Sequence, residues 1–323
     1  MLSELTFAEL KQQQQPVVLA PKNDVTQVVA RYLQQHQIPF VGYSDSVQQT
    51  ADCIAVTDIP SNAISLIFSN NHWKAIAQRL ENTQCYVITA VDGGYRFIAT
   101  REFAEYQPEQ LRIHNNLISQ QLFWQQHIEA YMARGEAIER YGYSWGDPEA
   151  SQDPLGNYRW INDKVQSWIA TDTTLLDLGT MSGKWLPFFL HAKQIICVDI
   201  NDAFVDVVKG RFAEHVEKFR FYQTQGNELH GIASGSVDVV FCMDTLVRVD
   251  KNFIESYFSD IDRVLTPTGK FVIHLPCDDY EGSVSRNFTS ISRAEIQQIL
   301  AKLQRTARIV DDVIVHGVLV IAE

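Results

Sequence analysis

The sequence predicts an α/β fold in which a smaller N-terminal α/β domain precedes a larger α/β sheet domain. Three observations support this prediction. The chain has 323 residues, more than one domain usually holds. Short apolar runs alternate with helical patterns in both halves, which is typical of mainly parallel sheets. A segment of aromatic, Gly and Pro residues separates the halves. We therefore predict a small domain over residues 1–105, a helical connector with an aromatic loop over 106–152, and a second domain over 153–323.

Composition and charge narrow the range of partners. Hydrophobic residues make up 46% and charged residues 20%, an ordinary globular balance, and the net charge is −12. Such an acidic surface repels nucleic acids and anionic lipids, and Lys and Arg are scattered rather than clustered. The sequence has no membrane-spanning run and no basic, apolar leader at its start. Its five cysteines are widely spaced, which is typical of reduced thiols in a cytoplasmic protein.

The N-terminal elements are predicted from apolar periodicity. Helical spacing predicts helices over 24–37 and 71–80. The last strand closes a hairpin across the turn at Asp92–Gly94. The apolar runs predict strands over 16–20, 40–43, 53–56, 63–68, 85–90 and 95–99.

The first turn of this domain, Pro21–Asp24, lacks the glycines that a dinucleotide pyrophosphate requires. The layout of a strand, a helix and then FVGYSD is similar to the small nucleotide-sugar-binding domain of some bacterial sugar-modifying enzymes. The residues themselves favour a packing or homodimerisation domain over a ligand-binding one.

The connector is predicted to hold one long helix over Leu117–Tyr141. After it, Tyr141–Pro148 combines aromatic residues with Gly and Pro, and Tyr158 and Trp160 follow. Ordered aromatic loops of this kind either cover a pocket or pack two domains together.

The most informative segment is Thr174–Gly183, TLLDLGTMSG. An apolar strand ends at Asp177 and turns through Gly179 toward a helix predicted over Lys184–His191. Gly179 permits a tight turn with the backbone close to a ligand. Backbone N–H groups at the start of a helix favour a negatively charged group.

A second acidic residue follows in register. The strand over 194–198 ends at Asp199, 22 positions after Asp177. An acid at this place in a nucleotide-binding sheet holds the ribose hydroxyls of a nucleoside. The two strands, the glycine turn and the second acid together predict a nucleoside-like ligand at the strand tips.

In this region the sequence resembles the class I S-adenosylmethionine-dependent methyltransferases. The resemblance covers residues 153–323 and implies a seven-stranded, Rossmann-like methyltransferase sheet with S-adenosylmethionine as the cofactor. Its later elements occur in order: a third strand over 219–222, QGNEL at 225–229, a fourth strand with its tip over 236–244, a helix, turn and fifth strand over 261–275, a helix over 292–303, and a final antiparallel pair over 308–315 and 317–322.

The resemblance implies which residues hold the cofactor. Three positions depart from the common pattern: Met181 replaces a glycine, Asn227 replaces an acid that reads the adenine amino group, and Arg248 replaces a histidine. The amide oxygen of Asn227 can still accept a hydrogen bond from that amino group. The cofactor-binding residues that we predict are Asp177, Gly179, Thr180, Met181, Gly183, Asp199, Ile200, Gly226, Asn227, Glu228 and Asp244.

The acceptor side is less specified. A hydroxyl acceptor needs a general base, whereas an amine or thiolate mainly needs alignment. We predict His274, at the end of the fifth strand, and Tyr143 as catalytic residues, with Asp244 as a further candidate base and Arg248 as a contact for an anionic acceptor. No short metal-ligand spacing occurs, so the sequence predicts no metal.

We expect a small polar acceptor, such as a sugar, a sugar nucleotide or a natural-product intermediate. Three alternatives remain at this point: an NAD-dependent oxidoreductase on a similar sheet, a non-catalytic cofactor-binding or scaffold protein, and a protein or RNA methyltransferase. The missing GxGxxG motif counts against the first, and the acidic charge counts against the last.

Overall fold

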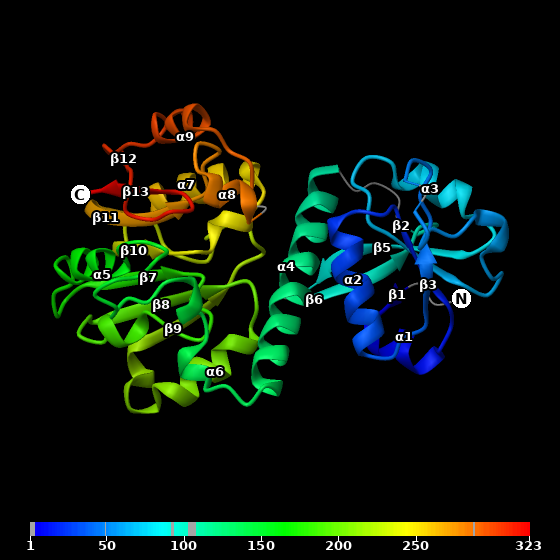
Figure 1. The fold of residues 1–323 in the computed structure, drawn as a ribbon, viewed down its shortest axis with the longest axis horizontal. Coiled ribbons are helices and arrows are strands. Elements are labelled where there is room, and N and C mark those ends of the chain that lie inside the picture. Colours follow the sequence, from blue (N-terminus) through cyan, green and yellow to red (C-terminus); the bar gives the residue numbers. More distant parts are fainter. Residues whose placement is uncertain (1–3, 49, 92–93, 103–107, 287) are drawn as a thin grey trace. The chain divides into compact units, whose positions relative to one another are not determined.

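The computed structural model describes residues 4–48, 50–91, 94–102, 108–286 and 288–323 (Figure 1). The chain divides into two compact units, Met1–Ile128 and Glu129–Glu323. The boundary predicted at residue 105 lies outside the described residues, and the boundary at 152 stays a prediction. Among the helices of the described ranges, none has the length and apolar character needed to cross a bilayer.

The first unit is built on a six-stranded sheet in the order β1-β6-β5-β4-β2-β3. Strands β3, β2, β4 and β5 run parallel, and β6 and β1 are antiparallel additions. The hairpin of β5 and β6 is as predicted, although Asp92 and Gly93 of its turn lie outside the described residues. The elements are β1 (Glu4–Leu5), α1 (Phe7–Gln13), β2 (Val17–Ala20), α2 (Asp24–Gln35), β3 (Phe40–Tyr43), β4 (Ile64–Ile67), α3 (Trp73–Arg79), β5 (Gln84–Val91), β6 (Gly94–Ala99) and α4 (Pro108–Ala133).

Two predictions for this region are wrong. Residues 53–56 form no strand; Cys53 makes only an isolated bridge to Tyr43, and a 3-10 helix follows at Val56–Asp58. The long helix begins nine residues earlier than predicted and ends at Ala133, because Gly135 takes a left-handed conformation with φ +72°.

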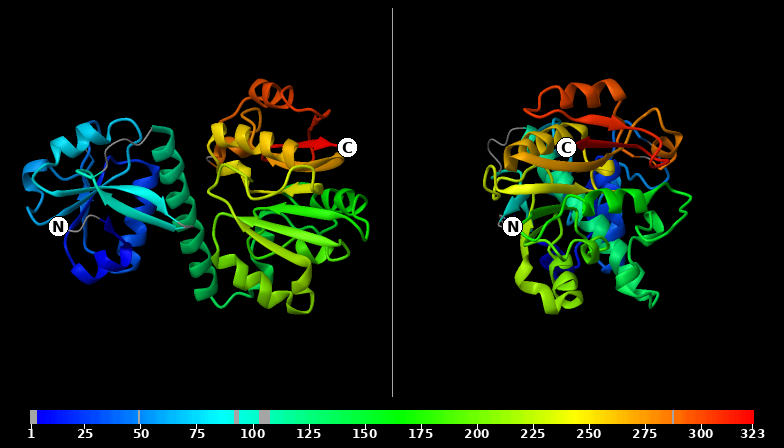
Figure 2. Two further views of the ribbon diagram at one scale, coloured as in Figure 1. Left: turned by 180° about the vertical axis from the view of Figure 1, so that it is seen from behind. Right: turned by 90° about the vertical axis from the view of Figure 1, so that its left-hand side faces the viewer.

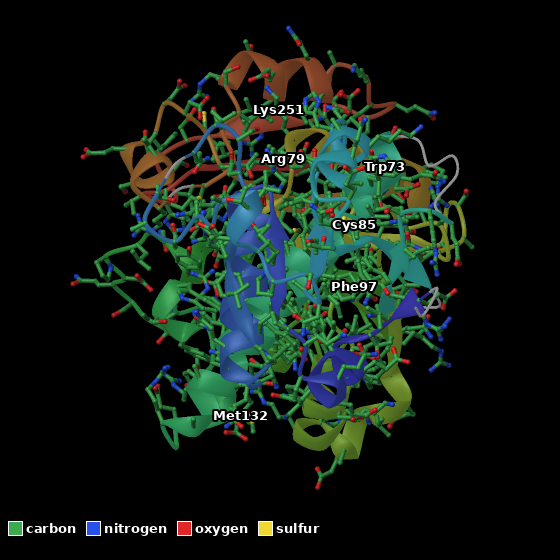
Figure 3. All side chains as sticks on the ribbon, turned by 90° about the vertical axis from the view of Figure 1, so that its right-hand side faces the viewer. Trp73, Arg79, Cys85, Phe97, Met132 and Lys251 are labelled. Atoms are coloured by element: carbon green, nitrogen blue, oxygen red, sulfur yellow. The ribbon has the colours of Figure 1, made fainter. Side chains whose placement is uncertain are left out.

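Buried side chains cover both faces of the first sheet, since successive residues of a strand point to opposite sides. Phe97 belongs to the cluster that α1, α2 and α4 cover. Trp73 belongs to the cluster beneath α3 (Figure 3). The side-chain amide of Gln126 in α4 donates to the carbonyl of Val28 in α2 at 3.3 Å, which joins these two helices.

The second unit is built on a seven-stranded sheet in the order β12-β13-β11-β10-β7-β8-β9, with helices on both faces (Figure 2). Strands β9, β8, β7, β10 and β11 run parallel, and β13 pairs antiparallel with both β11 and β12, as the resemblance implies. The elements are α5 (Tyr158–Gln166), β7 (Thr174–Leu178), β8 (Gln194–Asp199), α6 (Ala203–Arg211), β9 (Phe219–Gln223), β10 (Val237–Cys242), α7 (Lys251–Val264), β11 (Leu265–Leu275), α8 (Glu281–Ser285), α9 (Arg293–Leu300), β12 (Arg308–Val310) and β13 (Val318–Ala322).

The core of this unit brings the carboxyl ends of its parallel strands together. On one face, α5 and the segment after β7 pack on the sheet through a cluster that includes Tyr158, Trp185 and Phe241. On the other face, Phe258 of α7 meets Phe271 of β11 edge-to-face at 6.0 Å between ring centroids. In an open parallel sheet, ligands bind outside the carboxyl ends of the strands, so these tips position the candidate site.

Candidate functional site

The loop after β7 is the tightest turn of the site. Asp177 is buried in the strand, and the N–H groups of Gly179 and Thr180 donate to the carbonyl of Val198 at 2.7 and 3.2 Å. Gly179 has φ +84°, and a Cβ added there would overlap the side chain of Thr245. Gly183 closes the loop with φ +79°. Only glycine adopts this backbone without strain, so the loop has the shape that the sequence predicts.

The helix predicted over Lys184–His191 is absent. The segment forms successive turns around a 3-10 helix at Leu186–Phe188. Pro187 has no N–H to donate to an α-helical ladder, and Gly183 just before the segment is left-handed. The expectation that a helix N-terminus attracts a negative group behind the loop is therefore wrong. The glycine turn and its backbone remain.

Asp199, at the tip of β8, orders this loop. Its carboxylate accepts from the N–H of Met181 at 2.9 Å and from that of Asn201 at 3.0 Å. Met181 has φ +47°, so the residue that departs from the common glycine still takes a left-handed conformation. The predicted cofactor acid is thus also the group that fixes the turn opposite it.

Burial shifts the titration of both strand-tip acids. It raises the pKa of Asp177 to about 7. It also raises the pKa of Asp199 to about 6, although backbone N–H groups oppose the shift. Each carboxyl is thus closer to protonation at neutral pH than an exposed one, and a ligand that needs the ionised form binds better at higher pH.

The loop after β9 contains a buried acceptor without a hydrogen-bond partner. Gly226 has φ +92°, and Oδ1 of Asn227 is buried with no donor among the described residues. Glu228 instead supports the loop: it accepts from the Tyr222 hydroxyl at 2.6 Å. The carbonyl of Ile200 accepts from the Gln223 side chain at 3.2 Å, which ties the tip of β8 to that of β9.

Asp244, just after β10, is the centre of a buried polar cluster. It has φ +58°, and its Oδ1 lies 2.9 Å from Nδ1 of His274. Its Oδ2 lies 3.7 Å from Nζ of Lys184, which also donates to the carbonyls of Gly142 and Gly146 at 3.1 Å each. Hydrogen bonds from His274 and His316 and the charge of Lys184 lower the pKa of Asp244 despite its burial. Asp244 therefore links the strand tips to the aromatic loop.

Two members of this cluster were missed by the sequence analysis as site residues. The Tyr158 hydroxyl lies 3.2 Å from Nε2 of His316 and 3.4 Å from Oδ1 of Asp244. His316 is 42 residues after His274, so no short motif marks the pair. The signal was indirect: Tyr158 stood in the aromatic segment, and His316 stood at the turn before the final strand.

The other predicted catalytic residues have aromatic neighbours. The guanidinium of Arg140 lies 3.9 Å above the ring of Tyr143. Arg248 stacks on Phe288 at 5.2 Å, and the Phe288 ring in turn lies 5.8 Å from that of His316. The structure thus joins His274 directly to Asp244, connects Arg248 to the cluster through one ring, and places Tyr143 in the 3-10 helix Tyr143–Trp145 of the aromatic loop.

Part of the second unit is similar in sequence to known proteins. Residues 176–273 match a family model described as a methyltransferase domain. Thiol S-methyltransferase TMT1A of Homo sapiens is 34% identical over 100 residues, 30% of this chain and 40% of that protein. Thiol S-methyltransferase TMT1B of Rattus norvegicus is 31% identical over 116 residues, 35% of this chain and 47% of that protein. The matches thus span less than half of these relatives.

Among solved structures, a SAM-dependent methyltransferase from Aquifex aeolicus is 18% identical with a TM-score of 0.41, covering 53% of this chain and 93% of that one. The matched residues run from β7, through the glycine loop and Asp199, to the end of β11. The C-terminal region of the chain contains a methyltransferase domain, as its resemblance to the S-adenosylmethionine-dependent methyltransferases implies.

Proposed function

We propose that this protein transfers the methyl group of S-adenosylmethionine to a small-molecule thiol. The observation that carries methyl transfer is the Gly179 turn, which packs against Thr245 and lies between the strand-tip acids Asp177 and Asp199 within a methyltransferase domain. S-adenosylmethionine supplies a methyl group that its sulfonium charge has already activated. The chain then mainly has to bind and align the two reactants.

The residues present fit this cofactor. The loop 179–183 and Asp177 would hold its amino-acid end, and Asp199 with Ile200 would hold its ribose. The partnerless Oδ1 of Asn227 is a ready acceptor for the adenine amino group, because a buried acceptor without a donor is costly. Gly226 and Glu228 shape that loop, and Asp244 stands beside Thr245 at the next strand tip.

A thiol suits this site better than the sugar-like acceptor that we expected from the sequence. His274 is fully buried and so presents no surface to an acceptor, and the lowered pKa of Asp244 makes its carboxylate a weak base. A hydroxyl acceptor needs a positioned base. A thiol, with a pKa of about 8.5, supplies its own thiolate. The names of the relatives support the same class.

A small molecule also fits the net charge of −12 better than nucleic acid or a membrane surface does. We further propose a cytoplasmic location, which the five unpaired cysteines support.

The thiol proposal predicts that ionisation of the acceptor thiol, and not of a protein side chain, controls the rate. With two thiols of different pKa, the midpoint of the rise of kcat/KM with pH will move with the thiol, because the thiolate is the nucleophile. The measurement is transfer of a labelled methyl group to each thiol and to matched alcohols. One midpoint shared by both thiols, or efficient methylation of the alcohols, would show that the protein supplies the base instead.

The two acids predict how cofactor binding depends on pH. Because burial raises their pKa values to about 7 and about 6, acidification protonates both before it protonates an exposed carboxyl. The affinity for S-adenosylmethionine will therefore fall as the pH is lowered from 7 to 5, by roughly tenfold per pH unit for each proton that binding must displace. Calorimetric titration at each pH measures this affinity. Asp199→Asn should remove the share of the pH dependence that arises from Asp199. A constant affinity over this range contradicts the prediction.

A further inference from the structure

Four donor atoms from separate parts of the second unit converge beside the strand tips. They are Oδ1 of Asp244, Nδ1 of His274, Nε2 of His316 and the hydroxyl oxygen of Tyr158. Donor atoms of the carboxylate and the two imidazoles all lie within 4.8 Å of one another. Tyr158 comes from α5, Asp244 follows β10, His274 lies in β11, and His316 precedes β13. The chain folds residues that are up to 158 positions apart into one cluster.

Four of the six separations between these atoms are close to the edge length of a coordination tetrahedron. Zinc bonds of 2.0–2.1 Å to nitrogen and oxygen place neighbouring ligand atoms about 3.3 Å apart. Oδ1 of Asp244 lies 2.9 Å from Nδ1 of His274 and 3.6 Å from Nε2 of His316. The Tyr158 oxygen lies 3.2 Å from His316 and 3.4 Å from Asp244. These four separations lie on both sides of the expected value.

The surroundings of the cluster resemble those of a structural metal site. His274 and Tyr158 are fully buried and His316 is 4% exposed, so a bound ion would be shielded from water. Metal ligands need outer groups that fix their orientation. Lys184 approaches Oδ2 of Asp244, which leaves Oδ1 to face the cluster. Packing fixes the ring of His274, because Gly317 lies against its Nε2, where an added Cβ would lie 2.7 Å away.

We propose that Asp244, His274 and His316, with Tyr158 as a fourth donor, form a binding site for a Zn²⁺-type divalent metal ion. Two imidazoles and oxygen donors suit zinc and its neighbours in the first transition row. One carboxylate and one phenolate would balance the two positive charges. The ion would fasten α5 and the turn before β13 to the tips of β10 and β11. The site stands independently of the proposed methyl acceptor.

The test uses the full chain, treated with a chelator and then titrated with Zn²⁺ alone by calorimetry and with Co²⁺ alone by visible absorption. We expect one equivalent of either ion, with the intense visible bands of tetrahedral Co²⁺ and without the charge-transfer bands that cysteine thiolates give. His316→Gln should weaken binding roughly 100-fold or more, because removing even an outer partner of a metal ligand costs 10–100-fold. The matched control is His191→Gln, an exposed histidine in the same unit, which should bind as the wild type does.

Several results would overturn the proposal. If the wild-type chain binds neither Zn²⁺ nor Co²⁺ in a defined ratio, the cluster is a hydrogen-bonded network and not a metal site. Equal binding by His316→Gln and the wild type, or thiolate bands in the Co²⁺ spectrum, would place the ion elsewhere. If His316→Gln does not fold, Tyr158→Phe keeps the ring and its packing; this variant should fold and give an altered Co²⁺ spectrum. An unchanged spectrum would remove Tyr158 from the site.

Discussion

Gly179→Val will abolish binding of S-adenosylmethionine. A Cβ at this position overlaps the side chain of Thr245, and the backbone has φ +84°, which a β-branched residue does not adopt without strain. The turn must therefore open, and with it the N–H bonds of Gly179 and Thr180 to Val198 are lost. Calorimetric titration of the variant should show no heat of binding at concentrations that saturate the wild type.

Two further variants separate a local effect from general unfolding. Gly210 lies in α6, and a Cβ added there meets nothing within 4 Å, so Gly210→Ala should bind as tightly as the wild type. Gly179→Ala with Thr245→Gly removes the overlap and leaves only the backbone strain, roughly 1–2 kcal/mol for a left-handed non-glycine residue. That pair should regain part of the affinity. Full affinity in a folded Gly179→Val protein would mean that the cofactor binds elsewhere.

Lys184→Met will destabilise the second unit by roughly 3–5 kcal/mol, the usual cost of leaving one partner of a buried ion pair alone. Lys184 is buried, its Nζ lies 3.7 Å from Oδ2 of Asp244, and it donates to the carbonyls of Gly142 and Gly146. Methionine keeps most of the side-chain volume and supplies neither the charge nor the donors. Denaturant unfolding, followed by a probe in the second unit, measures the loss of stability.

The control for Lys184→Met is a substitution in an exposed ion pair whose N–O distance is shorter. Lys251 and Glu295 lie 2.8 Å apart at the surface, where water screens their attraction, so Lys251→Met should change stability little. Combining Lys184→Met with Asp244→Asn should cost less than the sum of the two single changes, because the second removes the charge that the first leaves unpaired. Strict additivity would show that the two groups do not interact.

The strand tips were predictable from the sequence because their signals are local. The apolar runs that end in Asp177 and Asp199 form neighbouring parallel strands in the structure, and the predicted glycine turn follows the first of them. The order of the later strands followed from the family resemblance. By contrast, the helix predicted after the glycine loop does not form, because Pro187 has no N–H to donate and Gly183, just before the segment, is left-handed. A pattern of apolar spacing alone does not register that interruption.

The polar cluster was not predictable from spacing, because it depends on tertiary contacts. His274 was predicted as a catalytic residue from its place at a strand end, and the structure shows why that place matters: it meets Asp244 there. His316 and Tyr158 reach the same point only because β13 returns beside β11 and α5 packs across the sheet. Lys184 was read as the start of a helix, and its burial beside Asp244 has no counterpart in the local sequence.

Calorimetric titration of the intact chain with S-adenosylmethionine, and in parallel with NADH, tests the central claim most directly. The account predicts one equivalent of S-adenosylmethionine per chain, no binding of NADH, and no binding of S-adenosylmethionine by Gly179→Val. Binding of NADH without S-adenosylmethionine would contradict the assignment of this sheet to methyl transfer.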